Sequence, residues 1–183
     1  MIENELIISQ TKKWITEIVI GCNFCPFAAK EMKRNTIHYE VENRREIKVG
    51  LDSFLKECIR LDENKNIETS LLIFPQSFKR FDDYLNLVFR AEKLLKKKGY
   101  EGVYQVASFH PLYCFADSSE DDAANFTNRS PYPMLHILRE ERIEQALLNY
   151  PNPEKIPKNN INFAREKGYA YMKMLRDECL IPS

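Results

Sequence analysis

The sequence predicts an α/β fold, with a small, partly parallel sheet of three or slightly more strands flanked by helices and followed by a C-terminal helical segment. Three short strand patterns alternate with two amphipathic helix patterns between residues 36 and 109. Strand–helix–strand units of this length are joined by right-handed crossovers, which make the strands parallel. A chain of 183 residues can bury one core without disulfides or metal, so residues 1–183 are expected to form a single globular domain.

Each of the three strands has its own hydrophobic pattern. Residues 36–41 alternate between apolar and polar side chains, as in a half-buried strand. Residues 69–74 form a nearly continuous apolar run that ends at a proline, which is typical of a strand covered on both faces. Residues 102–109 are predicted to form the third strand, which stops before His110 and Pro111.

Helical spacing of apolar residues marks the other elements. The first helix is expected to end at Gly21, and a short helix to begin near Cys25 and Pro26, because proline is favoured in a first helical turn. A proline-rich connector, residues 150–157, precedes the last helix. The longer predicted helices cover approximately residues 7–19, 51–59, 81–95, 133–149 and 159–178.

Composition narrows the class of protein. Lysine plus arginine and aspartate plus glutamate both total 27, so the chain lacks the basic surplus of a general nucleic-acid binder. Five scattered cysteines are an odd number, unlike the dense, paired cysteines of secreted disulfide-stabilised proteins. The acidic N-terminus does not resemble a signal peptide, and no apolar run approaches the roughly 20 residues that span a bilayer. We therefore expect a cytoplasmic protein with no membrane or nucleic-acid partner.

Polar chemistry is concentrated between Gln105 and Glu140. Within this region, residues 112–131 have no periodicity of their own, and a structureless loop of about twenty residues in a compact domain is often functional. The loop follows the predicted carboxyl end of a strand, where ligands bind in open α/β sheets. A candidate site is therefore expected at the carboxyl edge of the sheet.

An anion site is predicted within this loop. The run from Asn125 to Ser130 leads into a predicted helix, with Ser130 as N-cap and Pro131 in the first turn. Unpaired backbone amides at a helix start, beside the planar guanidinium of Arg129, favour a phosphate or carboxylate. Asn125 and Asn128 would orient polar groups of the ligand. The alternative is that these residues serve turn and cap chemistry alone.

Two histidines flank the loop. His110 lies just past a strand end, where its imidazole could act as acid, base or metal ligand, or could cap the strand. His136, Arg139 and Glu140 fall at i, i+3 and i+4, so they would share one face of the predicted helix 133–149. An ordinary polar helix face is the alternative interpretation.

A Cys-x-x-Cys pair, Cys22 and Cys25, raises the possibility of thiol chemistry. A zinc finger is disfavoured because no second ligand pair follows at finger spacing, and the preceding helix does not fit a thioredoxin-type site. Cys25 precedes Pro26 at a predicted helix start, where backbone amides would lower the thiol pKa. Buried packing is the alternative for both cysteines.

The sequence resembles a bacterial family catalogued as domain of unknown function number 1415. The resemblance runs over nearly the whole chain. It is carried by Trp14, Val19-Ile20-Gly21, Asn23, Cys25-Pro26-Phe27-Ala28, Glu68-Thr69, Leu71-Leu72, Glu101-Gly102-Val103, Gln105-Val106-Ala107-Ser108-Phe109-His110-Pro111, Tyr113, Phe115, Asp121-Asp122, Asn125, Thr127-Asn128-Arg129-Ser130-Pro131-Tyr132-Pro133, Leu135-His136 and Leu138-Arg139-Glu140. The family brings no assigned activity. Its pattern includes Cys25 but not Cys22, which implies that Cys25 acts alone.

The leading hypothesis is an enzyme that acts on a small anionic metabolite, although the sequence does not name a reaction. Arg129 and Arg139 would hold a carboxylate or phosphate, and His110 would be the acid or base. Cys25 would be a nucleophile activated by His110 or His136. On this hypothesis Arg129 serves binding more than folding.

Two alternatives stay open. A divalent metal cofactor could be bound by His110, His136 and Asp121 or Asp122, because imidazole and carboxylate suit zinc, iron or manganese. The protein could instead be a non-catalytic module that binds an anionic ligand or a partner. Neither the substrate, the pathway nor the oligomeric state follows from the sequence.

Overall fold

The computed structural model describes residues 2–181, in which a four-stranded sheet is flanked by helices. The strands are β1 (Ile37–Val41), β2 (Thr69–Ile73), β3 (Tyr104–Phe109) and β4 (Met134–Arg139), in the order β1-β2-β4-β3. β1 and β2 are parallel, and β4 is antiparallel to both of its neighbours. The predicted α/β class and the three predicted strands are confirmed, and the fourth strand makes the sheet mixed.

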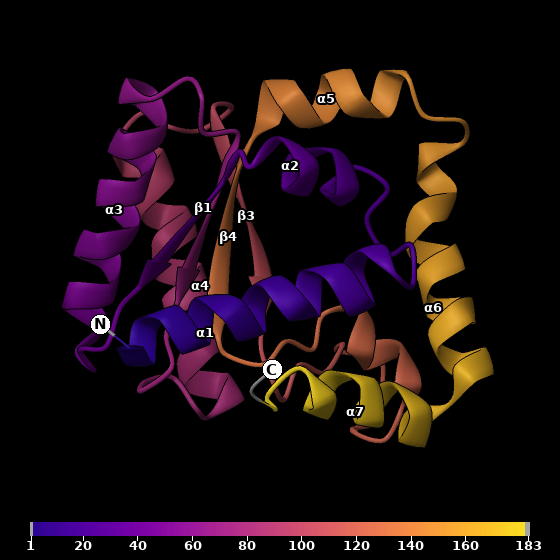
Figure 1. Cartoon of the computed structure of the whole chain (residues 1–183). Helices are drawn as coiled ribbons and strands as arrows, with labels where there is room; N and C mark the ends of the chain where they lie inside the picture. Colours follow the sequence, from indigo (N-terminus) through magenta and orange to yellow (C-terminus); the bar gives the residue numbers. More distant parts are fainter. Residues whose placement is uncertain (1, 182–183) are drawn as a thin grey trace.

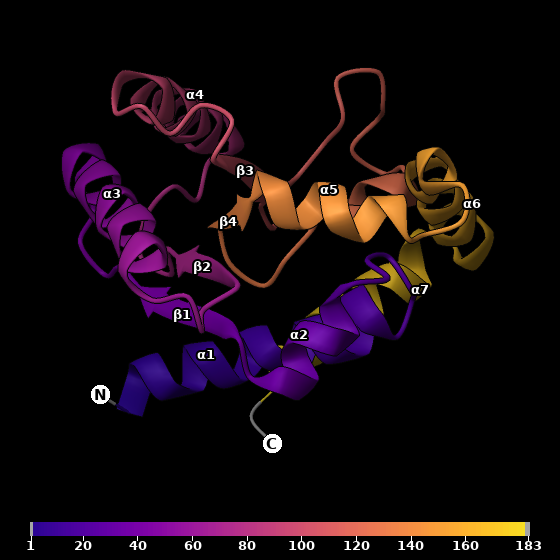
Figure 2. The ribbon, with the colours of Figure 1, turned by 90° about the horizontal axis from the view of Figure 1, so that it is seen from above.

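Helices cover both faces of the sheet (Figures 1 and 2). One face carries α1, the π-helix η1 and α2, while α3 and α4 cover the other. None of the helices in residues 2–181 is long and apolar enough to cross a bilayer. The helix bounds are α1 (Ile2–Trp14), η1 (Ile15–Ile20), α2 (Ala28–Arg34), α3 (Ile47–Glu63), α4 (Phe81–Lys97), η2 (Ala123–Thr127), α5 (Glu140–Leu148), η3 (Pro153–Lys155), α6 (Ile156–Lys167) and α7 (Tyr169–Glu178).

The apolar run of β2 is buried on both sides, as predicted. Alternate side chains of a strand point to opposite faces, so Leu71 joins a core with Trp14 while Leu72 joins a second core with Phe54 and Tyr84. Two separate cores are therefore stacked on the two faces of one sheet.

The predicted helix 133–149 is wrong in its first half. Residues 134–139 form β4, and helix α5 begins only at Glu140. A short apolar segment does not reveal its period from sequence alone. In the fold, this segment lies between β2 and β3 and satisfies the backbone hydrogen bonds of both.

This correction changes the predicted site. On a strand, His136 and Arg139 point to opposite faces, so they do not form a shared helix face. Residues 131–133 are not helical, and Ser130 therefore does not cap a helix. Without a helix start there, no set of unpaired helical amides lies beside Arg129 to favour an anion.

The last predicted helix is two helices, α6 and α7, which meet at Gly168. Gly168 has a φ of 81°, in the left-handed region that breaks a helix and favours glycine. The first helix ends before Gly21, as predicted, but its final turn is the π-helix η1. A Cβ atom on Gly21 would lie 2.2 Å from the carbonyl oxygen of Glu17, so glycine permits this close turn.

Candidate functional site

A cavity of about 700 Å³ lies between the sheet and the elements η1, α2 and α5. Its apolar lining includes Trp14, Ile15, Leu71 and Phe109. A volume of this size is typical of small-molecule sites, which combine an apolar lining with a few polar groups. The cavity opens over the sheet face, not at the carboxyl edge that the sequence predicts.

His136 is the histidine that lines this cavity. The hydroxyl oxygen of Thr69 lies 2.6 Å from both the Nε2 atom of His136 and the carbonyl oxygen of Ile137. The carbonyl can only accept, so the single hydroxyl hydrogen goes to Ile137 and the Nε2–H of His136 donates to Thr69. The Nδ1 atom is then a lone-pair acceptor.

The remaining ring nitrogen of His136 is available to a ligand. Nδ1 has no hydrogen-bond partner within residues 2–181, and it is not sealed from solvent. Burial lowers the pKa of His136 to about 4, because the charged imidazolium is poorly solvated there. At neutral pH, His136 therefore presents a neutral acceptor to the cavity.

Cys25 lines the same cavity and is half-buried, whereas Cys22 is in the core. The predicted lowering of the Cys25 pKa is wrong in direction. Burial raises the pKa, and the backbone amides of Phe27 and Ala28 oppose it only in part. Helix α2 begins at Ala28, three residues beyond the thiol, and has only seven residues. All five cysteines are free thiols.

Positive charge gathers at the rim of the cavity. Lys30 and Arg34 come from α2, and Arg142 comes from α5. The Nε atom of Arg142 lies 3.5 Å from a carboxylate oxygen of Glu68, and the Nζ atom of Lys30 lies 3.9 Å from one of Glu31. Arg34 forms no ion pair within the described residues 2–181. With Glu31, the lining holds three basic side chains against two acidic ones, because the guanidinium of Arg139 is turned to the α3 side.

His110 lies on the α4 side of the sheet, away from Cys25. It is fully buried and packs against Tyr84, with ring centroids 4.9 Å apart and the ring planes tilted by 36°. Its Nδ1 accepts from the backbone amide of Leu112 at 3.0 Å, so its Nε2–H donates to the carbonyl of Phe78 at 2.8 Å. Burial lowers the pKa of His110. Both ring nitrogens therefore hold the backbone, and His110 is not placed to activate Cys25.

Arg129 holds the long loop in the same way. Its guanidinium donates to the carbonyl oxygens of Tyr113 (2.9 Å) and Glu120 (2.7 Å) and stacks over Phe126. The side chain is only 6% exposed, and its carbonyl accepts from the indole of Trp14. Arg129 thus closes the loop 112–131 against the protein interior.

The other predicted ligand-binding residues of the loop also bond to backbone. Asn125 accepts from the amide of Phe115 and donates to the carbonyl of Ser119. The side chain of Asn128 donates to Ser108, and the buried Ser130 hydroxyl donates to the carbonyl of Tyr132. The polar side chains of the loop therefore form the hydrogen bonds that hold its backbone. A ligand-binding role for these residues stays a prediction.

Arg139 and Asp122 are also held by hydrogen bonds or ion pairs within the protein, and Asp121 is on the surface. Arg139 borders the cavity, but its guanidinium donates to the carbonyls of Leu61 and Ile67. Asp122 caps η2 and pairs with Arg165 at 2.7 Å, while Asp121 is exposed. The ring atoms of His110 and His136 are not part of any group of three metal-ligand atoms within residues 2–181.

Several cavity residues were not identified from sequence. Thr69 is a polar residue at the start of an apolar strand, and Gln105 sits on the exposed side of β3. Lys30, Arg34 and Arg142 are ordinary surface charges in sequence, and only the folding of α2 and α5 toward one another collects them. Thr69 and Gln105 were the detectable signals, because each interrupts a strand pattern.

The fold and the cavity define an α/β protein with a mixed four-stranded sheet and a small-molecule-sized hollow on one face. The sequence pattern of one protein family matches residues 6–174. The chain therefore belongs to that family, domain of unknown function 1415, described as "Protein of unknown function (DUF1415)". No curated protein and no solved structure matches the chain.

Proposed function

We propose that the protein binds a small anionic metabolite with an apolar body in the cavity over the sheet. The observation that carries this proposal is the combination of an apolar lining with one more basic than acidic side chain, the basic side chain without an acidic partner in residues 2–181 being Arg34. A carboxylate or phosphate would pair with Arg34 and Arg142, and the apolar body would pack on Trp14 and Phe109. The neutral Nδ1 of His136 would accept a hydrogen bond from a ligand donor.

Native mass spectrometry of the full chain, purified with its co-purifying metabolites, tests the proposal. The double variant Arg34→Gln/Arg142→Gln removes two rim charges and should lose the bound anion. The matched control Arg80→Gln removes an exposed charge at the start of α4 and should retain it. Equal retention of an anionic ligand by the double variant would contradict the proposal, as would a bound ligand that carries no negative charge.

Thiol catalysis on the bound metabolite is a second candidate function. The supporting observation is that Cys25 and His136 line one cavity. The Cys25 sulfur would form a bond to an electrophilic carbon of the metabolite, while the thiol proton passes to His136 Nδ1 and then to the departing group. The raised pKa of Cys25 means that this step needs a base beside the thiol.

Iodoacetamide labelling of the folded protein, resolved by mass spectrometry, tests whether Cys25 is reachable through the cavity. Half-buried Cys25 and Cys114 should label before the buried Cys22, Cys58 and Cys179. The Cys25 rate should be slow at neutral pH and rise with pH, because burial raises its pKa.

The variant Ala107→Phe provides the matching comparison, because it places a ring in the cavity. It should slow the labelling of Cys25 and leave Cys114 unchanged. Labelling of Cys25 only after denaturation would rule out thiol catalysis in this cavity.

A further inference from the structure

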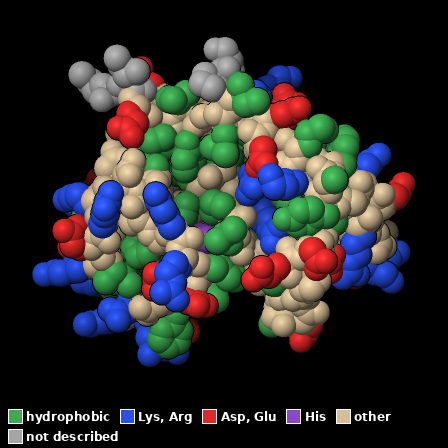
Figure 3. Space-filling view, turned by 90° about the horizontal axis from the view of Figure 1, so that it is seen from below, with side chains coloured by type: hydrophobic (Ala, Val, Ile, Leu, Met, Phe, Trp, Pro, Cys, Tyr) green, Lys and Arg blue, Asp and Glu red, His purple; other side chains and the backbone are tan. Residues whose placement is uncertain are grey.

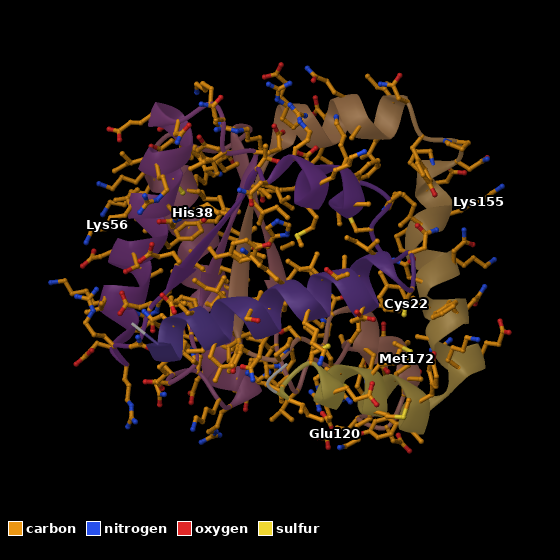
Figure 4. The ribbon with its side chains drawn as sticks, in the orientation of Figure 1. Cys22, His38, Lys56, Glu120, Lys155 and Met172 are labelled. Carbon is orange, nitrogen blue, oxygen red and sulfur yellow. The ribbon has the colours of Figure 1, made fainter. Side chains whose placement is uncertain are left out.

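A second polar cluster lies on the opposite face of the sheet. His38 and Glu40 share the α3-facing side of β1, and Glu57 approaches them from α3. The Nε2 atom of His38 is 3.5 Å from a carboxylate oxygen of Glu40 and 3.5 Å from one of Glu57. Figure 4 shows His38 beside α3, on which Lys56 is also labelled. The cluster is built from two rigid elements.

The central nitrogen of this cluster has no partner. His38 Nε2 is sealed from solvent and forms no hydrogen bond in the part of the chain that the structure describes. Leaving a buried polar atom unsatisfied is costly, which makes such an atom a marker of an absent ligand. Two carboxylate oxygens lie 3.5 Å from this nitrogen, so a cation between the three atoms would satisfy all of them.

The spacing fits a tetrahedral metal ion. Nitrogen and oxygen ligands lie about 2.1 Å from Zn²⁺, and tetrahedral ligand atoms at that distance are about 3.4 Å apart. The two observed separations from His38 Nε2 are 3.5 Å, and all three ligand atoms lie within 4.8 Å of one another. The described residues 2–181 contain one group of side chains that meets this condition.

Neighbouring side chains hold the buried carboxylate in place. Glu57 is 1% exposed, and one of its oxygens accepts from the hydroxyl of Ser70 at 2.5 Å. Its other oxygen accepts from the Nε of Arg60 at 3.0 Å, and Arg60 also approaches Glu40 at 3.6 Å. Such contacts from outside the ligand set orient metal ligands. A hollow of about 330 Å³ bordered by Glu40 and Glu57 adjoins the cluster.

We propose that His38, Glu40 and Glu57 bind one divalent first-row transition-metal ion, with water completing the coordination. One imidazole and two carboxylates suit zinc, iron or manganese better than calcium, which prefers more oxygen ligands. This site lies across the sheet from the cavity and does not depend on the ligand proposed there.

Equilibrium dialysis of the metal-depleted full chain against Zn²⁺, read by elemental analysis, tests the site. The wild-type chain should bind one ion. His38→Gln and Glu40→Gln should each weaken binding by at least about 10-fold. The matched controls His136→Gln and Glu92→Gln should bind as the wild type does, because neither residue belongs to the cluster. Far-UV circular dichroism confirms that each variant is folded.

Cobalt absorption separates this site from adventitious binding by the five free thiols. Co²⁺ held by His38, Glu40 and Glu57 should give ligand-field bands without a thiolate charge-transfer band, and Cys25→Ser should not alter them. A thiolate band, unchanged binding in His38→Gln, or no stoichiometric ion in the wild-type chain would each overturn the proposal.

Discussion

Buried polar side chains in this protein mostly hold backbone segments in place. The loop 112–131 and its surroundings show this most clearly. Backbone carbonyls and amides there form hydrogen bonds with the side chains of Arg129, Asn125 and His110. Their side chains are 6% exposed or less. His136 differs, because one ring nitrogen is fixed by Thr69 and the other is left to the cavity. At the scale of single residues, hydrogen bonding therefore distinguishes His110, which holds the backbone with both ring nitrogens, from His136, which does not.

Arg129→Lys should destabilise the fold. Lysine keeps the charge but loses the planar fork that reaches Tyr113 and Glu120 together, so at least one buried carbonyl is left without its charged donor. The free energy of unfolding, measured with urea, should fall by about 2 kcal/mol. Arg80→Lys, at an exposed site, is the control. A decrease in the free energy of unfolding of less than about 0.5 kcal/mol would lie within the range of surface substitutions. That result would favour the binding role that the sequence predicts for Arg129.

His136 should make stability depend on pH. Its pKa is about 4 in the folded protein and near 6.5 when unfolded, so the unfolded state binds more protons between these values. The stabilisation is full above about pH 6.5 and is lost as the pH falls toward 4, by up to about 3 kcal/mol. Urea unfolding at pH 7 and pH 5 measures the change in the free energy of unfolding with pH. In His136→Gln this change should be smaller, because the titrating imidazole is gone. An unchanged slope in His136→Gln would show that the imidazole is hydrated.

At the scale of elements, η1 and β4 shape the cavity. The π-helix places Ile15 and Val19 on the cavity wall, and the amide of Cys25 donates to the carbonyl of Val19. π-Helical turns occur frequently at functional sites. Strand β4 brings His136 onto the same face of the sheet. The cavity therefore depends on two elements whose type differs from the simple helical pattern of the sequence.

Gly21→Ala should disturb η1 and, through it, Cys25. The added Cβ would meet the Glu17 carbonyl at 2.2 Å, so the backbone must shift, at a cost of about 1–3 kcal/mol. Gly102→Ala is the comparison, because Gly102 also needs its glycine, for a φ of 77°, but has open space around it. Both variants should lower the melting temperature. Only Gly21→Ala should change the rate of Cys25 labelling. Equal Cys25 labelling rates in the two variants would show that η1 does not position the thiol.

At the scale of the whole molecule, the sheet separates the cavity from the cluster of His38, Glu40 and Glu57. The cavity with Cys25 and His136 lies on the α1 side, and the cluster of His38, Glu40 and Glu57 lies on the α3 side. Seen from below, hydrophobic patches alternate with charged side chains of both signs (Figure 3), in keeping with the zero net charge. The two sites share no lining residue, so loss of one should leave the other intact.

The sequence by itself determined the α/β class, three of the four strands and the places of most helices, because hydrophobic period is a local property. It also singled out Cys25 and His136, which line one cavity, and a chemical role for either stays a prediction. It did not reveal β4, because residues 134–139 become a strand only when β2 and β3 offer hydrogen bonds on both sides.

Only the tertiary structure decided which polar residues meet. Cys25 and His136 share a cavity because a turn after η1 lies over a central strand, whereas His110 is turned to the opposite face and fully hydrogen-bonded. Lys30 and Arg142 are distant in sequence and gather only when α2 and α5 pack over the sheet. A sequence records which donors and acceptors are present. Their partners are set by long-range contacts, and those partners decide whether a polar side chain holds the backbone or faces a ligand.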